Sequence, residues 1–183
     1  NTHHKEDPIK VIKKMKQTDN FKFDEANVMN ELVYRNLSED AKRQICAWKY
    51  GGEYDLYNLP SYEEMQVRQI GFMNPKSEKN YYGFWDESIL VGFVNILEEK
   101  EEVFIGIGVN PDLCNKHYGQ RMLLITYEIS KKLYPNKPLY LEVRTWNIRA
   151  VKCYQKAGFR IDGQAYELTT GIGTGTFYRM IRE

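Results

Sequence analysis

Two polar side chains that suit chemistry, those of Asn147 and Tyr154, lie seven residues apart near the C-terminal end of the chain. If the segment between them is helical, two turns bring both side chains onto one face. An asparagine at the start of a helix accepts hydrogen bonds from free backbone amides, and a tyrosine phenol can donate a hydrogen bond or a proton. The pair would then line one groove beside the end of a strand.

The surrounding sequence predicts the elements that position this pair. Residues 139–145 alternate apolar and polar side chains, which is the period of a strand. Residues 147–157 follow as a helix, with Asn147 as its N-cap and Ala150, Val151 and Tyr154 on one face. Gly158 can end this helix in a left-handed conformation. The segment therefore predicts a strand followed by a helix, with polar groups at the junction.

Seven residues of this unit have a recognisable spacing: Leu141, Val143, Asn147, Ala150, Tyr154, Gly158 and Phe159. The run resembles the C-terminal signature of the Gcn5-related N-acetyltransferases (GNAT), which move an acetyl group from acetyl-CoA to an amine. The resemblance covers about residues 31–183 and leaves residues 1–30 as an N-terminal extension. It implies a mixed α/β fold: a mostly antiparallel central sheet of about seven strands with one splayed parallel pair, and helices on both faces.

The rest of the pattern agrees with such a fold. Strands are expected near 31–37, 80–86, 89–97, 101–109, 159–169 and 176–182, and helices near 38–48, 62–71 and 118–133. The helix at 118–133 supplies the crossover that parallel strands 101–109 and 139–145 require. In the extension, Asp7-Pro8 can begin a short lysine-rich helix, which is either a basic surface for an anionic partner or a solvated appendage.

Strand 101–109 carries Gly106 and Gly108 on one face. Glycine weakens a strand unless something approaches its backbone closely. In the family, pantetheine adds to the exposed backbone of this strand, and that role suits both glycines. Tight packing of a helix on the sheet is the competing explanation.

The loop after this strand matches the family's pyrophosphate loop only in part. Cys114 stands where glutamine or arginine is expected, His117 stands where the first glycine is expected, and Gly119 keeps its place. Free backbone amides at a helix N-terminus favour phosphate, so the backbone can still bind it if His117 takes the required conformation. The resemblance implies the following acetyl-CoA site: Ile107, Gly108, Val109, Cys114, Asn115, Lys116, His117, Tyr118, Gly119, Gln120, Asn147 and Tyr154.

The resemblance also implies two catalytic residues. Tyr154 matches the family's helix tyrosine, which protonates the departing CoA thiolate; packing of its ring is the alternative role. Glu142 matches a glutamate that accepts the amine proton in relatives acting on protein N-termini, and an ion pair with Arg144 is the competing role. A structural or phosphate-side role is favoured for His117, and Cys114 has no histidine–acid partner that would support covalent catalysis.

Aromatic and acidic residues alternate over 48–58, where an acceptor amine could bind. Such a surface attracts a cation through charge and aromatic faces, and it resembles a loop found in some bacterial acetyltransferases. Packing of the aromatic side chains onto the core is the alternative. The candidate acceptor residues are Trp48, Tyr50, Glu53, Tyr54, Asp55 and Tyr57.

Composition narrows the remaining possibilities. The chain has 26 Lys and Arg against 25 Asp and Glu, which gives no support for a nucleic-acid partner. Three cysteines without a CxxC pair argue against a disulfide framework or a metal, and favour a cytoplasmic setting. No apolar run is long enough to span a membrane. A monomer or homodimer is expected.

These observations predict an acetyl-CoA-dependent N-acetyltransferase that acts on a primary amine of a small molecule or peptide in a ternary complex. The alternative is a non-catalytic acyl-CoA-binding or regulatory module on the same fold, which the altered loop at 114–119 suggests. A nucleotide-binding oxidoreductase is disfavoured, because Gly106-Ile107-Gly108 lacks the full GxGxxG pattern before a helix.

Overall fold

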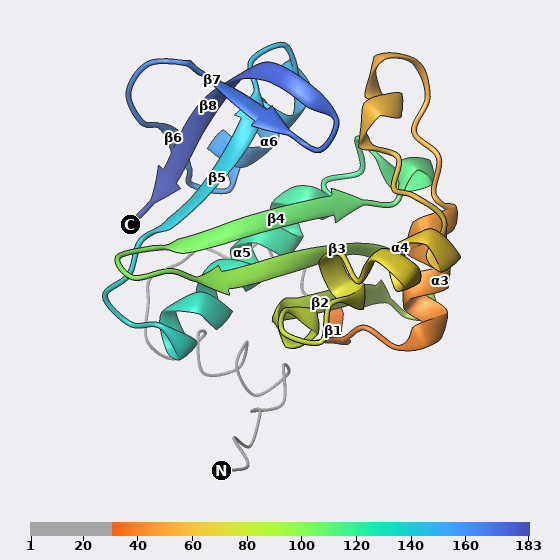
Figure 1. Ribbon diagram of the computed structural model, residues 1–183. Helices are drawn as coiled ribbons and strands as arrows, with labels where there is room; N and C mark the ends of the chain where they lie inside the picture. Colours follow the sequence, from red (N-terminus) through yellow and green to blue (C-terminus); the bar gives the residue numbers. More distant parts are fainter. Residues whose placement is uncertain (1–30) are drawn as a thin grey trace.

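A computed structural model describes residues 31–183 of the protein, and Figure 1 shows its elements. Eight strands form one sheet in the order β1-β2-β3-β4-β5-β8-β6, with β7 also paired to β8. The strands are β1 (Val33–Asn36), β2 (Tyr81–Asp86), β3 (Ile89–Glu98), β4 (Val103–Val109), β5 (Leu139–Arg144), β6 (Arg160–Ile161), β7 (Tyr166–Thr170) and β8 (Gly173–Arg182).

The helices are α3 (Glu39–Ala47), α4 (Tyr62–Arg68), α5 (Tyr118–Leu133) and α6 (Ile148–Lys156). Short 3-10 helices lie between them: η1 (Gly52–Tyr57), η2 (Gly71–Met73), η3 (Glu78–Asn80) and η4 (Pro111–Leu113). Ser38 and Ser61 cap α3 and α4, because each hydroxyl accepts a hydrogen bond from a backbone amide three residues further on. The caps explain why both helices begin where the sequence predicts.

One pair of strands, β4 and β5, runs parallel, and all other pairings are antiparallel. The helix α5 connects these two strands, as a parallel crossover requires. The prediction of a mixed, mostly antiparallel sheet with one parallel pair is therefore confirmed.

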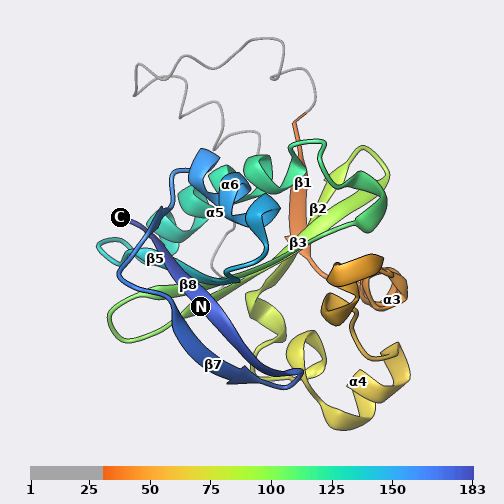
Figure 2. The same ribbon diagram turned by 90° about the horizontal axis from the view of Figure 1, so that it is seen from above.

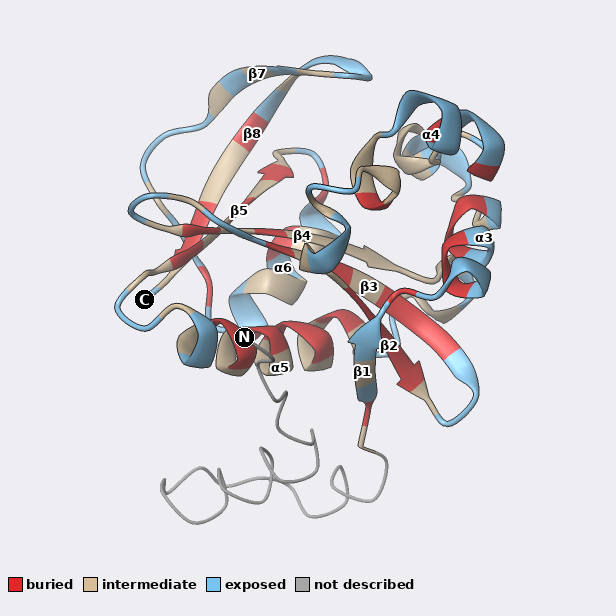
Figure 3. Ribbon diagram, turned by 60° about the horizontal axis from the view of Figure 1, so that its bottom comes forward, coloured by how far each residue is buried: buried red, intermediate tan, exposed pale blue. Residues whose placement is uncertain are grey.

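Helices cover both faces of the sheet, and each face has its own core. The larger core lies under α5 and α6 and includes Phe84, Met122 and Leu141, all of which are almost fully buried. The smaller core lies under α3 and α4, around Ile45 and Phe72. Figure 2 shows α5 and α6 on one side of the sheet and α3 and α4 on the other, and Figure 3 shows the buried residues gathered on the inner surfaces.

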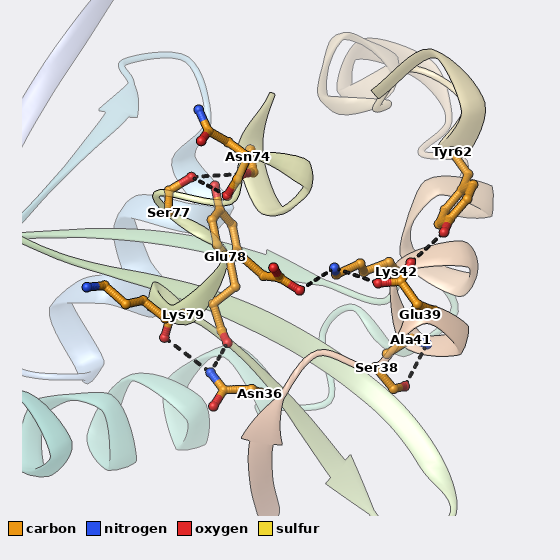
Figure 4. Close-up of polar contacts among 12 residues, drawn as sticks. Asn36, Ser38, Glu39, Ala41, Lys42, Tyr62, Asn74, Ser77, Glu78 and Lys79 are labelled. Carbon is orange, nitrogen blue, oxygen red and sulfur yellow. Dashed lines mark hydrogen bonds and ion pairs between the residues drawn. The ribbon is translucent and has the colours of Figure 1, made fainter. Parts of the chain in front are cut away.

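A buried lysine joins α3 to the segment before β2 (Figure 4). Lys42 has a side chain only 3% exposed, and its ammonium group contacts Glu39 at 2.9 Å and Glu78 at 2.8 Å. Burial by itself would lower the pKa of Lys42, but hydrogen bonds to the two carboxylates outweigh it and raise the pKa. Tyr62 of α4 donates a hydrogen bond to Glu39, so the cluster fixes α3, α4 and η3 relative to one another.

The C-terminal strands differ from the prediction. The single strand expected over 159–169 is two strands, because the chain turns at Gly163, whose φ is +75°. Both pieces pair with the same edge of β8, β6 near Met180 and β7 from Gly173 to Phe177. The sheet therefore has eight strands rather than about seven. The helix predicted after Asp7-Pro8 lies outside the described residues.

Candidate functional site: a cleft between two parallel strands

The parallel strands separate shortly after they begin. β4 and β5 pair only at Val103–Leu139 and Phe104–Tyr140. Beyond this point, β4 remains paired to β3 on its other side, but its edge toward β5 has no strand partner among residues 31–183. A cavity of about 670 Å³ opens at the splay, with walls from β4, β5, the start of α5, α6 and the loop before α4.

The structure gives different reasons for the presence of glycine at positions 106 and 108 of β4. At Gly108 a Cβ atom would lie 2.4 Å from the ring of Phe93, so packing of that ring requires a glycine. At Gly106 the nearest atoms would lie at 3.5 and 3.7 Å, which is ordinary contact. Packing therefore explains Gly108, but the packed group is a ring on the neighbouring strand β3 and not a helix, as the sequence had suggested. Gly106 lines the cavity without such a close contact.

The loop between β4 and α5 keeps the conformation of a glycine-rich loop without the glycine. His117 has φ +64° and ψ +11°, which is the left-handed region, and Asn115 also has φ +64°. The first bond of α5 runs from the Arg121 amide to the His117 carbonyl at 3.1 Å. The amides of residues 118–120 therefore precede the intrahelical ladder, at the positive end of a helix of 16 residues.

Most of the residues expected in this loop line the cavity: Cys114, Asn115, His117, Tyr118, Gly119 and Gln120. Lys116 is exposed and lies outside the lining. Gly119 contacts the next helix, since a Cβ atom there would lie 3.1 Å from Sγ of Cys153 on α6. The loop backbone, with no side chain at Gly119, can approach an anion closely.

Asn147 performs its predicted structural role and one more. Its Oδ1 accepts a hydrogen bond from the Ala150 amide at 3.2 Å, which caps α6. Its Nδ2 donates to the Tyr57 hydroxyl at 3.1 Å, so the side chain also joins α6 to η1. Asn147 is only 7% exposed but still lies on the cavity wall.

Tyr154 lies in the cavity wall two turns along α6 from Asn147. Burial raises the pKa of the Tyr154 phenol well above its usual range, and the neighbouring Cys153, Tyr57 and Tyr50 add to the effect. Burial likewise raises the pKa of the Tyr50 and Tyr57 phenols. All three phenols are therefore neutral near pH 7. The Tyr50 hydroxyl donates its proton to the Val109 carbonyl, whereas the Tyr57 hydroxyl accepts from Asn147 and keeps its own proton for donation, as the neutral Tyr154 phenol does.

Glu142 faces the cavity from β5. One of its carboxylate oxygens, Oε2, is buried without a hydrogen-bond partner among the described residues. Burial and the negative charge of Glu142 raise the pKa of Tyr166 to about 12, which places that phenol beside the carboxylate. The guanidinium of Arg144 lies 4.8 Å over the ring of Phe177, and no ion pair within residues 31–183 joins it to Glu142.

The segment 48–59 crosses one side of the cavity. The Tyr50 hydroxyl donates to the Val109 carbonyl at 2.6 Å, at the end of β4. The ring of Tyr54 lies 5.7 Å from that of Trp146, and the guanidinium of Arg149 lies 4.1 Å over Tyr54. Trp48, Tyr50, Tyr54 and Tyr57 line the cavity.

Two predicted acceptor residues lie apart from this group. Glu53 and Asp55 are exposed and do not line the cavity, so a direct contact with an amine there remains a prediction. Sequence reasoning missed Trp146 and Arg149, which flank the cap of α6 and contact η1. The tryptophan directly before Asn147 was the available signal, because a large aromatic side chain usually packs against another group and is seldom left fully in solvent.

The cavity carries more positive than negative charge. Its lining includes Arg144, Arg149, Lys152 and Lys156, against Glu142 as the single carboxylate from the described part of the chain. This excess suits an anionic ligand such as a phosphate ester. It also leaves one partly buried acid, Glu142, on the stretch of β5 beyond its pairing with β4.

The comparisons with known proteins agree with this geometry. The model of the acetyltransferase (GNAT) family matches residues 42–159. Since this is more than half of the chain, the protein belongs to the acetyltransferase (GNAT) family. The prediction of an N-acetyltransferase, and of its fold, is thus confirmed at the level of the family. No curated protein matches the sequence significantly.

Solved structures with the same fold share little sequence with this chain. An acetyltransferase from Bacillus anthracis is 18% identical, with a TM-score of 0.67 over 84% of this chain and 95% of that one. A spermidine N-acetyltransferase from Vibrio cholerae, solved with CoA and spermine, is 18% identical, with a TM-score of 0.66 over 82% and 94%. An acetyltransferase from Streptococcus pneumoniae is 23% identical, with a TM-score of 0.60 over 83% and 98%.

Within residues 31–183, no group of three or more His, Cys, Asp or Glu side chains is placed to hold a metal ion. None of the helices in the same range is both long and apolar enough to cross a membrane. The compartment and the oligomeric state remain predictions.

Proposed function

We propose that residues 31–183 form one catalytic domain that transfers the acetyl group of acetyl-CoA directly to a primary amine of a small molecule or peptide. The observation that carries the proposal is the cleft between β4 and β5, which brings a free strand edge, a helix N-terminus, Tyr154 and Glu142 into one cavity. The GNAT family uses acetyl-CoA, and the lining of this cavity fits it. Its amides and cations suit the phosphates, and the apolar faces of Ile107 and Leu141 suit pantetheine.

The reaction requires the amine to lose a proton before it attacks. Glu142 accepts this proton, directly or through a water molecule. A buried oxygen without a protein partner is a good acceptor for a cationic amine, because pairing with the cation offsets the cost of burying the carboxylate. The amine nitrogen then forms a C–N bond to the thioester carbon. Backbone N–H groups on the open edge of β4 stabilise the resulting oxyanion.

The intermediate collapses when the C–S bond breaks and the sulfur leaves as a thiolate. The Tyr154 phenol is neutral at pH 7 and supplies the proton that converts the thiolate to the thiol of CoA. The attacking nitrogen, which became positively charged when the C–N bond formed, releases its extra proton as the amide forms. The phenolate recovers a proton from solvent, and Glu142 returns the first amine proton to solvent. The amine and the thioester must occupy the cavity together, so the reaction proceeds through a ternary complex.

The identity of the amine is a narrower proposal. A cationic amine fits a cavity that Glu142 lines together with the aromatic side chains of Trp48, Tyr54 and Tyr57. Polyamines belong in the first set to be tested, since a structural neighbour is a spermidine N-acetyltransferase. Amino acids and peptide N-termini complete the set.

The alternative, a non-catalytic acyl-CoA-binding module, arose from the missing glycine at position 117. His117 already has the left-handed conformation that a glycine would supply, so the altered loop no longer favours loss of the cofactor site. Turnover separates the two functions, because a binding module would bind acetyl-CoA without acetylating any amine.

The test is steady-state kinetics of the wild type with polyamines, amino acids and peptide N-termini. The same kinetics are then measured for two variants whose new side chains have nearly the size of the original ones. We expect Tyr154→Phe to lower kcat by about 10²–10⁴-fold while the affinity for acetyl-CoA stays within about twofold. Glu142→Gln should lower kcat/KM for the amine most at low pH, where more of the amine is protonated. Full turnover by Tyr154→Phe, under conditions in which chemistry limits the rate, would remove Tyr154 from this role.

A further inference from the structure

Two lysines on α6 lie in the cavity wall and have no assigned role in the reaction. Lys152 and Lys156 are four residues apart, so their side chains share one face of the helix. Both residues are exposed, and neither forms an ion pair with any carboxylate in residues 31–183. Their charge is therefore available to a ligand.

The turn of α6 that carries Lys152 packs against the N-terminus of α5. Cys153, the residue after Lys152, lies against Gly119 in the first turn of α5. The free amides of residues 118–120 are thus next to the helical turn that carries Lys152. An anion that passes over this N-terminus comes within reach of the lysine side chains. Lys156 extends the same positive surface by one further turn.

Acetyl-CoA carries more phosphate than the helix N-terminus can bind. Its pyrophosphate links pantetheine to the nucleoside, and backbone amides are suited to the charged, non-bridging oxygens of that group. Its third phosphate is a monoester on the 3′-oxygen of the ribose, with a charge of about −1.5 to −2 near pH 7, as for other phosphate monoesters. Lysine ammonium groups act as mobile point charges that suit a dianion on the rim of a site.

Arg149 is less available for this purpose, although it belongs to the same helix. Its guanidinium lies over the ring of Tyr54, and this contact holds the segment 48–59 against α6. Arg144 is likewise stacked on Phe177. Within the described part of the chain, the two lysines are therefore the cations of the cavity without an ion pair or an aromatic contact.

We propose that Lys152 and Lys156 bind the 3′-phosphate of the coenzyme, and so make the enzyme select acetyl-CoA over its dephospho form. The inference rests on the proposed function, because it requires the coenzyme to lie in this cleft. It adds a discriminating contact at the nucleotide end, remote from the thioester.

The test removes the phosphate from the ligand and the charge from the protein, separately and together. Calorimetry measures the Kd of CoA and of dephospho-CoA for the wild type and for Lys152→Ala/Lys156→Ala. Two partly screened charge pairs predict that CoA binds about tenfold tighter than dephospho-CoA to the wild type. The variant should lose that factor for CoA and bind dephospho-CoA within about twofold of the wild type.

Matched controls separate a specific contact from a general field. Lys76→Ala/Lys100→Ala removes the same charge from exposed positions outside the cavity, and it should leave the preference for CoA unchanged. Lys152→Arg/Lys156→Arg keeps the charge and should retain most of the preference. Thermal unfolding checks that each variant is folded.

Several results would overturn the inference while the proposed function stands. These are equal affinity of the wild type for both ligands, an equal loss for both ligands in the alanine variant, or the same loss in the control pair. The second result would assign the lysines to the pyrophosphate instead. Failure of the wild type to bind either ligand would refute the proposed function itself.

Discussion

The two glycines of β4 give the most direct test of how the cleft is built, because each has its own physical reason. At Gly108 an added methyl group would lie 2.4 Å and 2.9 Å from two atoms of the Phe93 ring. That ring cannot move away easily, since the rings of Trp48, Phe72 and Tyr81 lie between 6.2 and 6.4 Å from it. Overpacking of this kind costs about 1–3 kcal/mol.

At Gly106 the same substitution meets only ordinary van der Waals contacts. The nearest atoms would lie at 3.5 and 3.7 Å, so no neighbour has to move. Alanine also loses less backbone entropy than glycine on folding, which adds about 0.5–1 kcal/mol to the free energy of unfolding. Gly106→Ala should therefore be as stable as the wild type or slightly more stable, but its methyl group would extend into the cavity and impair turnover.

The assay is urea unfolding of Gly108→Ala and Gly106→Ala, with thermal unfolding as a second measure. A loss of 1–3 kcal/mol corresponds to a fall in Tm of about 2–12 °C for a domain of this size. The double variant Gly108→Ala/Phe93→Leu should recover part of that loss, because a smaller side chain leaves room for the methyl group. Equal stability of Gly108→Ala and the wild type would refute the argument from ring packing.

Three further predictions test other parts of the structure. Lys42→Met should lower the free energy of unfolding by less than about 1.5 kcal/mol at pH 7, because both carboxylate partners are more than half exposed and can return to water. The hydrogen bond from Lys42, and then that from Tyr62, lowers the pKa of Glu39, so this stabilisation is present above pH 4.5 and is lost as the pH falls through the lowered pKa. Unfolding scans of the wild type and the variant should therefore converge at acid pH. Tyr57→Phe should cost about 1–2 kcal/mol in urea unfolding, because the buried Nδ2 of Asn147 loses its acceptor; an unchanged midpoint would show that water replaces the phenol. His117→Gly should raise the free energy of unfolding by about 0.5 kcal/mol, because glycine adopts the left-handed conformation without strain. If the backbone amides bind the phosphates, calorimetry should find the affinity of this variant for CoA within about twofold of the wild type. A tenfold loss of affinity would instead show that the imidazole binds the coenzyme.

The sequence predicted the elements around the signature well, because the information there is local. The cap at Asn147 and the left-handed Gly158 are properties of single residues, and both are present in α6 and at its end. The crossover from β4 to β5 followed from the length of the helical segment between them. The strand alternation in 139–145 also gave the correct face for Glu142.

What the sequence did not predict depends on contacts between distant segments. The ring of Phe93 over Gly108 joins two strands, and nothing in either strand indicates that contact. The helix η1 forms where Tyr57 reaches Asn147, 90 residues further along the chain. The break between β6 and β7 follows from a single positive φ at Gly163, which the apolar pattern does not encode. Pairwise packing, rather than propensity, decides each of these features.

The segment 48–59 links the two halves of the proposed site. Tyr50 bonds to the last carbonyl of β4, which lies on the cofactor side, while Tyr57 bonds to Asn147 at the start of α6. The same segment presents Trp48 and Tyr54 to the cavity, where we propose that the amine binds. An amine that shifts these aromatic side chains would therefore also shift the groups that border the thioester. Since both substrates would bias one segment, their binding free energies should be coupled, and by linkage each would change the affinity of the other by the same factor.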